Sequence, residues 1–442
     1  MIPIAHKIEL VPNNKQKTYF RKAFGCARLA YNWGLAEWQR RYKAGEKCSW
    51  VDLQKSYNSI RKIEYPFTLE VTKFASTEPF RNLGKSFSKF FKDLKKGTVS
   101  YPRFKKKKDS QGSFYVAGEK IHLSSNEHKT KVFNTIPVHN FRKKEYLYIP
   151  KLGWVRMTQK LRFHGKINGV HISQEGDKFF ASFDMFVTKD EFRHTHPQTK
   201  DTYKEKAVGI DLGVKYALTL SDGIFIENYK PIKKSLRKIK KLGRQLSKRS
   251  YARTKQERLN GKKKSNNYRK LSVKLANAHR RVANIRRDYT HKITTILTTH
   301  YGKIALENLN VKGMARNHRI AQSISDVAFG ELCRQIEYKA INNDVTIKKA
   351  DRFYPSSKVC SVCGNVKHDL KLSARIYHCD KCGALIDRDY NASLNLLSLI
   401  TEKQIGADYP ESTPEDLTAL LSRFERNKIA TSKVETGRQR KL

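Results

Sequence analysis

Residues 207–227 read AVGIDLGVKYALTLSDGIFIE, and this stretch decides the fold of the second half of the chain. A short apolar run ends at Asp211, and two further apolar runs, residues 216–221 and 224–227, follow it. Runs of this length separated by turn residues predict a meander of three short strands. We therefore expect a new domain to begin near the start of this stretch.

The sequence after this meander continues the same domain. The expected elements are a long basic helical stretch to about residue 299, a strand at 304–306, a helix at about 323–343, a strand at about 345–350 and a final helix at about 390–400. Three strands followed by helix, strand, helix and strand is the order of an RNase H-like fold. That fold brings the ends of its first and fourth strands together beside a late helix.

Three acidic residues stand at the ends of these expected elements. Asp211 and Glu307 each end a short apolar strand, and Asp389 opens the final helix. Three gathered carboxylates would repel one another unless cations held them, and two Mg²⁺ ions about 4 Å apart can hydrolyse a phosphodiester. Asp211, Glu307 and Asp389 are therefore the candidate catalytic residues and magnesium ligands. The competing interpretation is three unrelated surface acids or helix caps.

Four of the seven cysteines form two closely spaced pairs. Cys360 and Cys363 are separated by two residues, as are Cys379 and Cys382. Each pair predicts a turn that directs two thiolates at one ion, and tetrahedral Zn²⁺ takes four such ligands. A closed four-ligand site leaves no position for substrate water, so we expect structural zinc, inserted within the nuclease domain. Unpaired cysteines elsewhere suit a reducing cytosol rather than a disulfide framework.

The charge of the chain indicates a nucleic-acid partner. The 442 residues carry 90 Lys and Arg against 41 Asp and Glu, a formal net charge of +49. This excess would repel itself without an anion, and a nucleic-acid backbone supplies one. Residues 231–287 hold 22 Lys and Arg and one acid, which favours a helix lining nucleic acid over an ordinary solvated helix. Without a signal peptide or an apolar run long enough for a membrane span, we expect no membrane partner and a cytoplasmic protein.

The first half of the chain predicts a mixed architecture. Residues 2–10 alternate weakly and predict an edge strand, residues 13–43 and 51–94 have helical patterns, and residues 110–200 read as strands. Residues 85–108 interleave ten Lys and Arg with five aromatic side chains. These aromatics either stack on bases or fill a helical core, and we favour the core for several of them.

These residues resemble a known family, TnpB of prokaryotic insertion sequences, the OrfB type. Three segments resemble its RuvC motifs: Gly209-Ile210-Asp211-Leu212-Gly213, Leu306-Glu307-Asn308-Leu309 and Asp387-Arg388-Asp389-Tyr390-Asn391-Ala392. Further segments that fit are Ser323-Ile324-Ser325-Asp326, Tyr354-Pro355-Ser356-Ser357, Leu10-Val11-Pro12-Asn13, Ala27-Arg28-Leu29-Ala30-Tyr31-Asn32, Tyr101-Pro102-Arg103-Phe104 and Leu152-Gly153-Trp154. The resemblance covers about residues 1–400 and is specific as a set.

The resemblance implies a multidomain α/β protein. Its expected parts are a β-rich wedge domain (1–12 and 105–200) split by a helical recognition domain (13–104), a RuvC-like nuclease domain (207–400) with a zinc ribbon-like insertion (355–386), and a mobile tail (401–442). It further implies an RNA-guided, divalent-metal-dependent DNA endonuclease with structural Zn²⁺ and two catalytic Mg²⁺. Its partners would be a guide RNA from the element and double-stranded target DNA, and a monomer is favoured.

The family recognises a short DNA motif beside its target. Lys73-Phe74-Ala75 matches a family motif with contact residues, so Lys73 and Phe74 are candidates for that contact. Thr77, the third candidate, stands where the family pattern has Gln, so the resemblance does not imply which motif this chain reads.

Three alternatives stay open beside this reading. A miniature type V CRISPR effector resembles the same motifs, and neighbouring genes would distinguish a CRISPR array from insertion-sequence ends. A cut-and-paste transposase also uses acids on an RNase H-like fold, but the zinc insertion before the third acid argues against it. A nuclease-inactive RNA-guided DNA-binding protein is disfavoured because all three acids are present.

Overall fold

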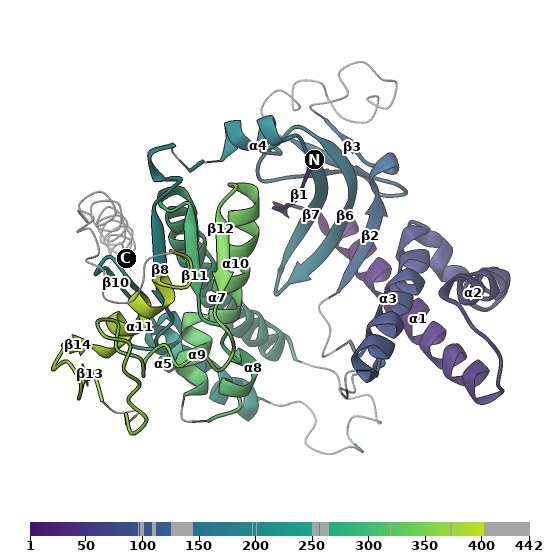
Figure 1. Cartoon of the computed structure of the whole chain (residues 1–442). Helices are drawn as coiled ribbons and strands as arrows, with labels where there is room; N and C mark the ends of the chain where they lie inside the picture. The colour runs from purple at the N-terminus through teal and green to yellow at the C-terminus, as the bar shows by residue number, and fades with distance from the viewer. Residues whose placement is uncertain are drawn as a thin grey trace, which may run out of the picture. The chain divides into compact units, whose positions relative to one another are not determined.

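The computed structural model describes residues 1–95, 97, 101–107, 112–124, 145–196, 198–199, 201–249, 256, 265–318, 320–371 and 374–401. The chain divides into two compact units, Met1–His196 and Pro197–Leu442 (Figure 1). The predicted mobile tail lies outside the described residues apart from Thr401. Among the helices that are described, none combines the length and the apolar character that a membrane crossing requires.

The first unit contains two antiparallel sheets and three long helices. Its strands are β1 (Ile2–Leu10), β2 (Ser113–Ala117), β3 (His122–Leu123), β4 (Tyr146–Ile149), β5 (Gly153–Arg156), β6 (Lys166–Glu175) and β7 (Lys178–Val187). One sheet has the order β1-β7-β6-β2 and the other β3-β4-β5, so the prediction of an edge strand at residues 2–10 is confirmed. The helices are α1 (Asn14–Lys43), α2 (Trp50–Glu64), α3 (Phe74–Leu94) and the short α4 (Lys189–Thr195).

Helix α1 belongs to two hydrophobic cores of this unit. Its first half buries Phe20 and Phe24 against Phe114 of β2 and Phe179 of β7. Its second half packs with α2 and α3 in a separate core that includes Tyr31. The capping box that begins the helix, Asn13 with Gln16, sets where the helix starts relative to both cores.

The predicted helical region 51–94 is two helices rather than one. Helix α2 ends at Glu64, a 3₁₀ turn covers Pro66–Glu70, and α3 begins at Phe74. Pro66 explains the break, because a proline disfavours the helical conformation of the residue before it. Tyr65 accordingly has φ −131° and ψ 50°.

The second unit is built on one five-stranded sheet of order β10-β9-β8-β11-β12. Its strands are β8 (Ala207–Asp211), β9 (Tyr216–Leu220), β10 (Phe225–Glu227), β11 (Lys303–Leu306) and β12 (Thr346–Lys349). Strands β8, β9 and β10 pair antiparallel, whereas β11 pairs parallel to both β8 and β12. The predicted meander, the later strands and their order along the chain are therefore present.

Helices of different lengths accompany this sheet (Figure 1). They are α5 (Pro231–Lys248), α7 (Asn266–His300), α8 (Val311–Met314), α9 (Ala321–Val327), α10 (Phe329–Asn342) and α11 (Arg388–Leu397). A small hairpin of β13 (Ile376–His378) and β14 (Leu385–Asp387) precedes α11. Buried apolar side chains of the strands, α7 and α10 form the main core of the unit.

The prediction of a single helix at about 323–343 was wrong, because two helices occupy this range. They meet at Ala328, whose φ of 58° is left-handed and ends α9. The turn lets Phe329 enter the core, where it is fully buried. It also directs Asp326 to the start of α5, where its carboxylate accepts hydrogen bonds from the amides of Ile232 and Lys233 at 2.7 and 3.3 Å.

Candidate nuclease and metal sites

The first two predicted acids lie at the same edge of the second unit's sheet. Asp211 is the last residue of β8, and Glu307 directly follows β11. The two strands are parallel neighbours with Leu306 opposite Ile210, so the acids after these residues are brought to the same end. Asp211 is buried and Glu307 is half-buried.

The third acid comes from α11, which packs against β8. Asp389 lies in the first turn of this helix. A Cβ atom added at Gly209 would lie 2.0 Å from the carbonyl oxygen of Ser393 and 2.4 Å from the amide nitrogen of Leu397. Gly209 thus allows the backbone of α11 to approach β8 closely, which brings Asp389 to the edge that carries the other acids.

The three carboxylates act on one another electrostatically. Burial is the main reason that the pKa of Asp211 rises well above its ordinary value, and the charges of Glu307 and Asp389 raise it further. Burial also raises the pKa of Glu307, a hydrogen bond from Ser356 opposes this rise, and the charge of Asp389 adds to it. Sequence reasoning predicted this gathering of like charges from the positions of the acids along the chain.

Two guanidinium groups accompany Asp389. Its carboxylate oxygens lie 3.3 Å from Nη2 of Arg388 and 3.9 Å from Nη1 of Arg375. Arg375 precedes the β13–β14 hairpin, and its side chain is largely exposed. These cations offset part of the negative charge of the acids from one side.

The three acids have the chemistry of a divalent-cation site, but their carboxylate oxygens do not lie as close together as the ligand atoms of the cysteine cluster do. Mg²⁺ prefers carboxylate oxygens, and its charge would offset the repulsion that raises the pKa of Asp211. Within the described part of the chain, the four cysteines are the only group of three or more His, Cys, Asp or Glu side chains whose ligand atoms all lie within 4.8 Å of one another. The acids therefore couple through their charges at longer range.

The four predicted cysteines converge on one point. The Sγ atoms of Cys360 and Cys382 are 3.7 Å apart, and those of Cys363 and Cys379 are 3.5 Å apart. Four sulfurs around a tetrahedral zinc with bonds of about 2.3 Å would lie about 3.8 Å apart. This cluster could hold a metal ion.

Backbone amides favour the thiolate form of Cys379, one of the four cysteines. Hydrogen bonds led by the amide of Cys382 lower the pKa of Cys379 to about 6. Gly364 and Gly383 follow the second cysteine of each pair, and their φ values of 74° and 73° are left-handed, a conformation that glycine adopts without strain. Their amides donate to the carbonyl oxygens of Cys360 and Cys379 at 2.9 and 3.0 Å and close the two turns.

Two asparagines join the cysteine segment to α11. Nδ2 of both Asn391 and Asn395 donates to the carbonyl oxygen of Val359 at 2.7 Å. The Oδ1 atom of Asn391 also accepts from the amide of Ser361 at 3.0 Å. The cysteine segment is therefore fixed to the helix that carries Asp389, as the insertion next to the third acid suggested.

Sequence reasoning missed the roles of three polar residues near these sites. Ser356 donates a hydrogen bond to Glu307, Asp387 caps α11, and Asp326 caps α5. Each belongs to a segment that resembles the family, so the segments were noticed. The individual roles depend on contacts between distant residues, as with Ser356 and Glu307, or on how a helix begins, as with Asp387.

The basic helices expose their charges as predicted. Ile232, Leu236 and Ile239 of α5 are half-buried, whereas Lys233, Arg237 and the other Lys and Arg side chains of this helix are exposed. Helix α7 packs beside α5 and carries the second part of the basic segment. Most of the predicted segment between these helices, residues 250–255 and 257–264, lies outside the described residues.

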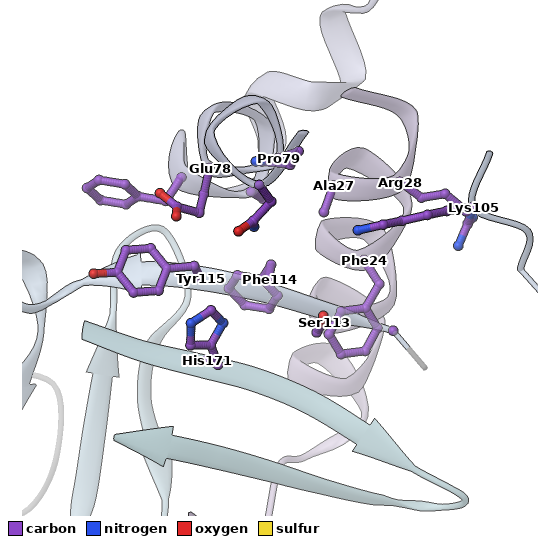
Figure 2. A pocket seen from close by; sticks show the side chains of 14 residues that line it. Phe24, Ala27, Arg28, Glu78, Pro79, Lys105, Ser113, Phe114, Tyr115 and His171 are labelled. Atoms are coloured by element: carbon purple, nitrogen blue, oxygen red, sulfur yellow. The ribbon is translucent and has the colours of Figure 1, made fainter. Parts of the chain in front are cut away.

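The predicted DNA-motif residues lie at the start of α3. Lys73 occupies the N-cap position, its Nζ lies 5.4 Å from the ring centroid of Phe74, and Thr77 donates to the carbonyl oxygen of Lys73 at 3.3 Å. Phe74 lines a cavity of about 110 Å³ within the first unit. Figure 2 shows Glu78 on one wall of this cavity and Tyr115 on the opposite one. The structure brings Phe74 to a polar cavity, with Lys73 exposed beside it.

The aromatic residues of segment 85–108 divide between the two predicted environments. Phe87 is buried in the helical core, and its ring stacks on Trp38 at a centroid distance of 4.0 Å. Phe91, Tyr101 and Phe104 are exposed by 46, 41 and 47%. The core therefore accounts for some of these aromatics and leaves three at the surface.

Comparison with known proteins finds similarity to insertion-sequence proteins. Three family models match: "Helix-turn-helix domain" of the OrfB_IS605 group over residues 1–47, "Probable transposase" of the same group over 190–318, and "Cas12f1-like, TNB domain" over 329–396. A solved complex titled "Cryo-EM structure of the Cas12f1-sgRNA-target DNA complex" has a TM-score of 0.49 and 15% identity, covering 87% of this chain and 83% of that one.

Two curated relatives match over most of their length. A protein of Streptomyces pristinaespiralis named "Putative RNA-guided DNA endonuclease" is 29% identical over 398 residues, 89% of this chain and 88% of the relative. An Escherichia coli K12 protein of the same name, InsQ, is 27% identical over 409 residues, 89% of this chain and 91% of the relative. Together with the two OrfB_IS605 models, these matches show that the chain is similar to insertion-sequence proteins of the OrfB type and to RNA-guided DNA endonucleases, in line with its resemblance to TnpB.

Proposed function

We propose that this protein is an RNA-guided DNA endonuclease that hydrolyses phosphodiester bonds with Asp211, Glu307 and Asp389. One observation carries the proposal: two neighbouring parallel strands and a helix bring three mutually repelling carboxylates to one edge of a sheet. The relatives that match most of the chain are named for this activity. The strand order β10-β9-β8-β11-β12 supports an RNase H-like nuclease domain of the RuvC kind.

The carboxylates would hold the catalytic cations. Two bound divalent ions would supply an activated water and stabilise the leaving oxygen of the phosphodiester. Asp211 at the end of β8, Glu307 after β11 and Asp389 on α11 would each contribute oxygen ligands. Arg375 and Arg388 would orient the carboxylate of Asp389, since both guanidinium groups lie within 4 Å of its oxygens.

The cysteine cluster would hold a structural zinc ion. Four thiolates fill a tetrahedral shell and leave no open position, so the ion would stabilise the fold rather than react. Asn391 and Asn395 connect this cluster to α11, so the ion would fix the segment that leads to Asp389.

The basic surfaces would bind the RNA and the DNA. The Lys and Arg side chains of α5 are exposed, and the whole chain has a formal net charge of +49. This positive charge suits the binding of two polyanions, the RNA and the DNA. Base pairing between the guide and the target strand would select the sequence. Lys73, Phe74 and Thr77 at the start of α3 would contact the short DNA motif beside the target.

A CRISPR effector is the second candidate. The model named "Cas12f1-like, TNB domain" matches residues 329–396, which include all four cysteines and Asp389. The same acids and cysteines would serve in both cases. Genes beside the coding sequence distinguish the two, since an effector requires a CRISPR array and an insertion-sequence protein requires the ends of its element.

The test begins with the RNA that copurifies with the protein. Low-salt purification is expected to yield a structured RNA whose sequence identifies the guide region. A plasmid that carries the complement of this guide beside a randomised flank is then incubated with the complex in Mg²⁺. We expect cleavage that depends on the guide, on one flanking motif and on Mg²⁺. Purified protein without RNA, or a complex that binds this plasmid without cutting it, would contradict the proposal.

A further inference from the structure

Ser356 makes a direct contact with one of the three acids. Its hydroxyl donates a hydrogen bond to Oε1 of Glu307 with an oxygen–oxygen distance of 2.6 Å, and the residue is 4% exposed. A hydroxyl bonded to an ionised carboxylate forms one of the short, strong hydrogen bonds of proteins. A hydroxyl has a single proton, so the hydrogen bond to Glu307 uses the one donor of the Ser356 side chain.

The backbone around Ser356 is held by α11. Nδ2 of Asn395 donates to the carbonyl oxygen of Ser356 at 2.7 Å, and the hydroxyl of Tyr354 donates to the carbonyl oxygen of Asn395 at 3.2 Å. The amide of Ser356 bonds the carbonyl oxygen of Tyr354 at 2.9 Å. Ser356 is therefore fixed to the helix whose first turn carries Asp389, while its side chain reaches the acid that follows β11.

The segment that contains Ser356 leads directly into the cysteine cluster. Val359 accepts hydrogen bonds from Asn391 and Asn395, and the next residue is the first cysteine of the cluster. Cys360 is fully buried. One short stretch of chain thus contacts Glu307 at its start and enters the metal-binding cluster at its end.

We propose that Ser356 is a positioning residue that holds one oxygen of Glu307 and so presents the other oxygen to the divalent cations. This inference rests on the proposed function, because it assigns the cations to the three acids. Glu307 follows the strand, where its side chain would otherwise choose among several rotamers. The buried hydroxyl selects one of them, and α11 sets where that hydroxyl stands.

The test compares two variants of equal shape. Ser356→Thr keeps the hydroxyl and Ser356→Val replaces it with a methyl group, so the pair differs in the hydrogen bond alone. Ser356→Ala is the simple deletion. Ser357→Ala is the matched control, because Ser357 is the adjacent half-buried serine, with no side-chain hydrogen bond to another described residue.

Two measurements are made on the RNA-bound protein. The first is Mn²⁺ binding, followed by the electron paramagnetic resonance signal of the free ion without target DNA. The second is the Mg²⁺ concentration that gives half-maximal cleavage. Loss of a group that orients a metal ligand typically weakens metal binding by about 10–100-fold, so we expect roughly tenfold weakening in Ser356→Val and Ser356→Ala. Ser356→Thr and Ser357→Ala are expected to stay within about twofold of the wild type, since both proteins still have a hydroxyl group at position 356.

Each outcome decides for or against the proposal. Equal Mn²⁺ binding by the Thr and Val variants would overturn it, even if Ser356→Ala unfolds, because the two larger side chains disturb the packing alike. Weaker binding by Ser357→Ala to the same degree would also overturn it, since the effect would then be a general loosening of the loop. A wild-type complex that never cuts DNA, but whose Mn²⁺ binding weakens when the Ser356 hydroxyl is removed, would contradict the proposed function and leave the positioning role in place.

Discussion

The two candidate metal sites of the second unit differ in how far the folded chain alone assembles them. The four cysteine sulfurs lie within 4.8 Å of one another, close to the spacing that tetrahedral zinc requires. The three acids are drawn from two strands and a helix, and their charges repel one another. The comparison teaches that local turns alone can bring four cysteines together, whereas the three acids meet only through the packing of elements that are distant in the chain.

The difference follows from where the ligands come from in the chain. The cysteines occupy one short segment, residues 360–382, in which two glycine turns orient both pairs. The acids span residues 211–389 and depend on the packing of α11 against β8 and on the parallel pairing of β8 with β11. Their arrangement therefore responds to any change in the sheet, the helix or the bound ions.

Loss of any one acid is expected to give the largest effect. Asp211→Ala, Glu307→Ala and Asp389→Ala should each reduce target cleavage by roughly 10³-fold or more while guide-dependent DNA binding persists. Double variants should be no worse than single ones, because one missing ligand already disables the unit. Cleavage and binding are measured with the same RNA-loaded complex, with and without EDTA. Full cleavage by all three variants would place the nuclease site elsewhere.

Removal of a cysteine ligand is expected to disturb both sites. Cys379→Ser should release most of the one zinc ion expected per chain, because three remaining ligands no longer close the tetrahedral shell. The segment joined to α11 by Asn391 and Asn395 should then loosen, and cleavage should fall with it. Elemental analysis and protease sensitivity check these results. Cys333→Ser is the control, since Cys333 lies outside the cluster.

Packing of α11 on β8 is expected to tolerate no side chain at residue 209. Gly209→Ala places a methyl group 2.0 Å from the carbonyl oxygen of Ser393, so the helix must move. Overpacking of this kind typically costs about 1–3 kcal/mol and occasionally more, so thermal unfolding should shift down by several degrees. Gly243→Ala in α5 meets nothing within 4 Å and should be neutral or slightly stabilising. Equal unfolding temperatures for the two variants would contradict this account.

The sequence was sufficient to predict the second unit's sheet and both candidate ligand sets. Alternating and continuous apolar runs mark the strands, and the spacing of the cysteines defines a metal cluster without reference to the rest of the fold. The acids could be chosen because each stands at the end of an expected element. These signals are local, and local patterns are what a single sequence displays most clearly.

The features that the sequence did not predict depend on contacts between distant residues or on unusual backbone conformations. The left-handed Ala328 divides a region whose helical pattern is continuous, because the pattern records burial and not φ. The bond from Ser356 to Glu307 joins residues 49 positions apart, and no periodicity reports it. Gly209 belongs to a motif that the sequence analysis identified. The requirement for glycine at this position comes from the close approach of α11, which only the packed structure shows.

Neutralising the buried acid is expected to stabilise the protein in the absence of divalent ions. The raised pKa of Asp211 means that the folded state binds this proton more tightly than the unfolded state. Stability is therefore lost as the pH rises above the ordinary value of 3.8 toward the raised value, and it stays lower beyond it. In EDTA at pH 8, Asp211→Asn should melt a few degrees above the wild type. For a unit of this size, each kcal/mol gained in the free energy of unfolding raises the melting temperature by about 2–4 °C.

The same variant tests whether divalent ions bind at the three acids. Added Mg²⁺ should raise the melting temperature of the wild type more than that of Asp211→Asn, since a ligand stabilises the state that binds it. Near pH 4 the gap between the two proteins in EDTA should shrink, because the pH then approaches the ordinary value of 3.8 and the unfolded state also begins to bind the proton that the folded state holds. A gap that widens toward pH 4 would mean that Asp211 is stabilised as an anion in the fold.

The smallest effect is expected at Asp387, two residues before the third acid. Its Oδ1 accepts hydrogen bonds from the amides of Asp389 and Tyr390 at 3.0 and 3.1 Å, so it is the N-cap of α11. Loss of an N-cap typically costs about 1 kcal/mol, and Asn restores most of it because its side-chain oxygen accepts the same bonds. Asp387→Ala should therefore melt slightly lower and retain substantial cleavage, and Asp387→Asn should behave like the wild type in both respects. Cleavage rates and unfolding curves of the two variants, compared with Asp389→Ala, separate a carboxylate that starts a helix from one that binds ions. An inactive Asp387→Asn beside an active Asp389→Ala would exchange the two roles, since Asn keeps the cap and removes the charge that a cation needs.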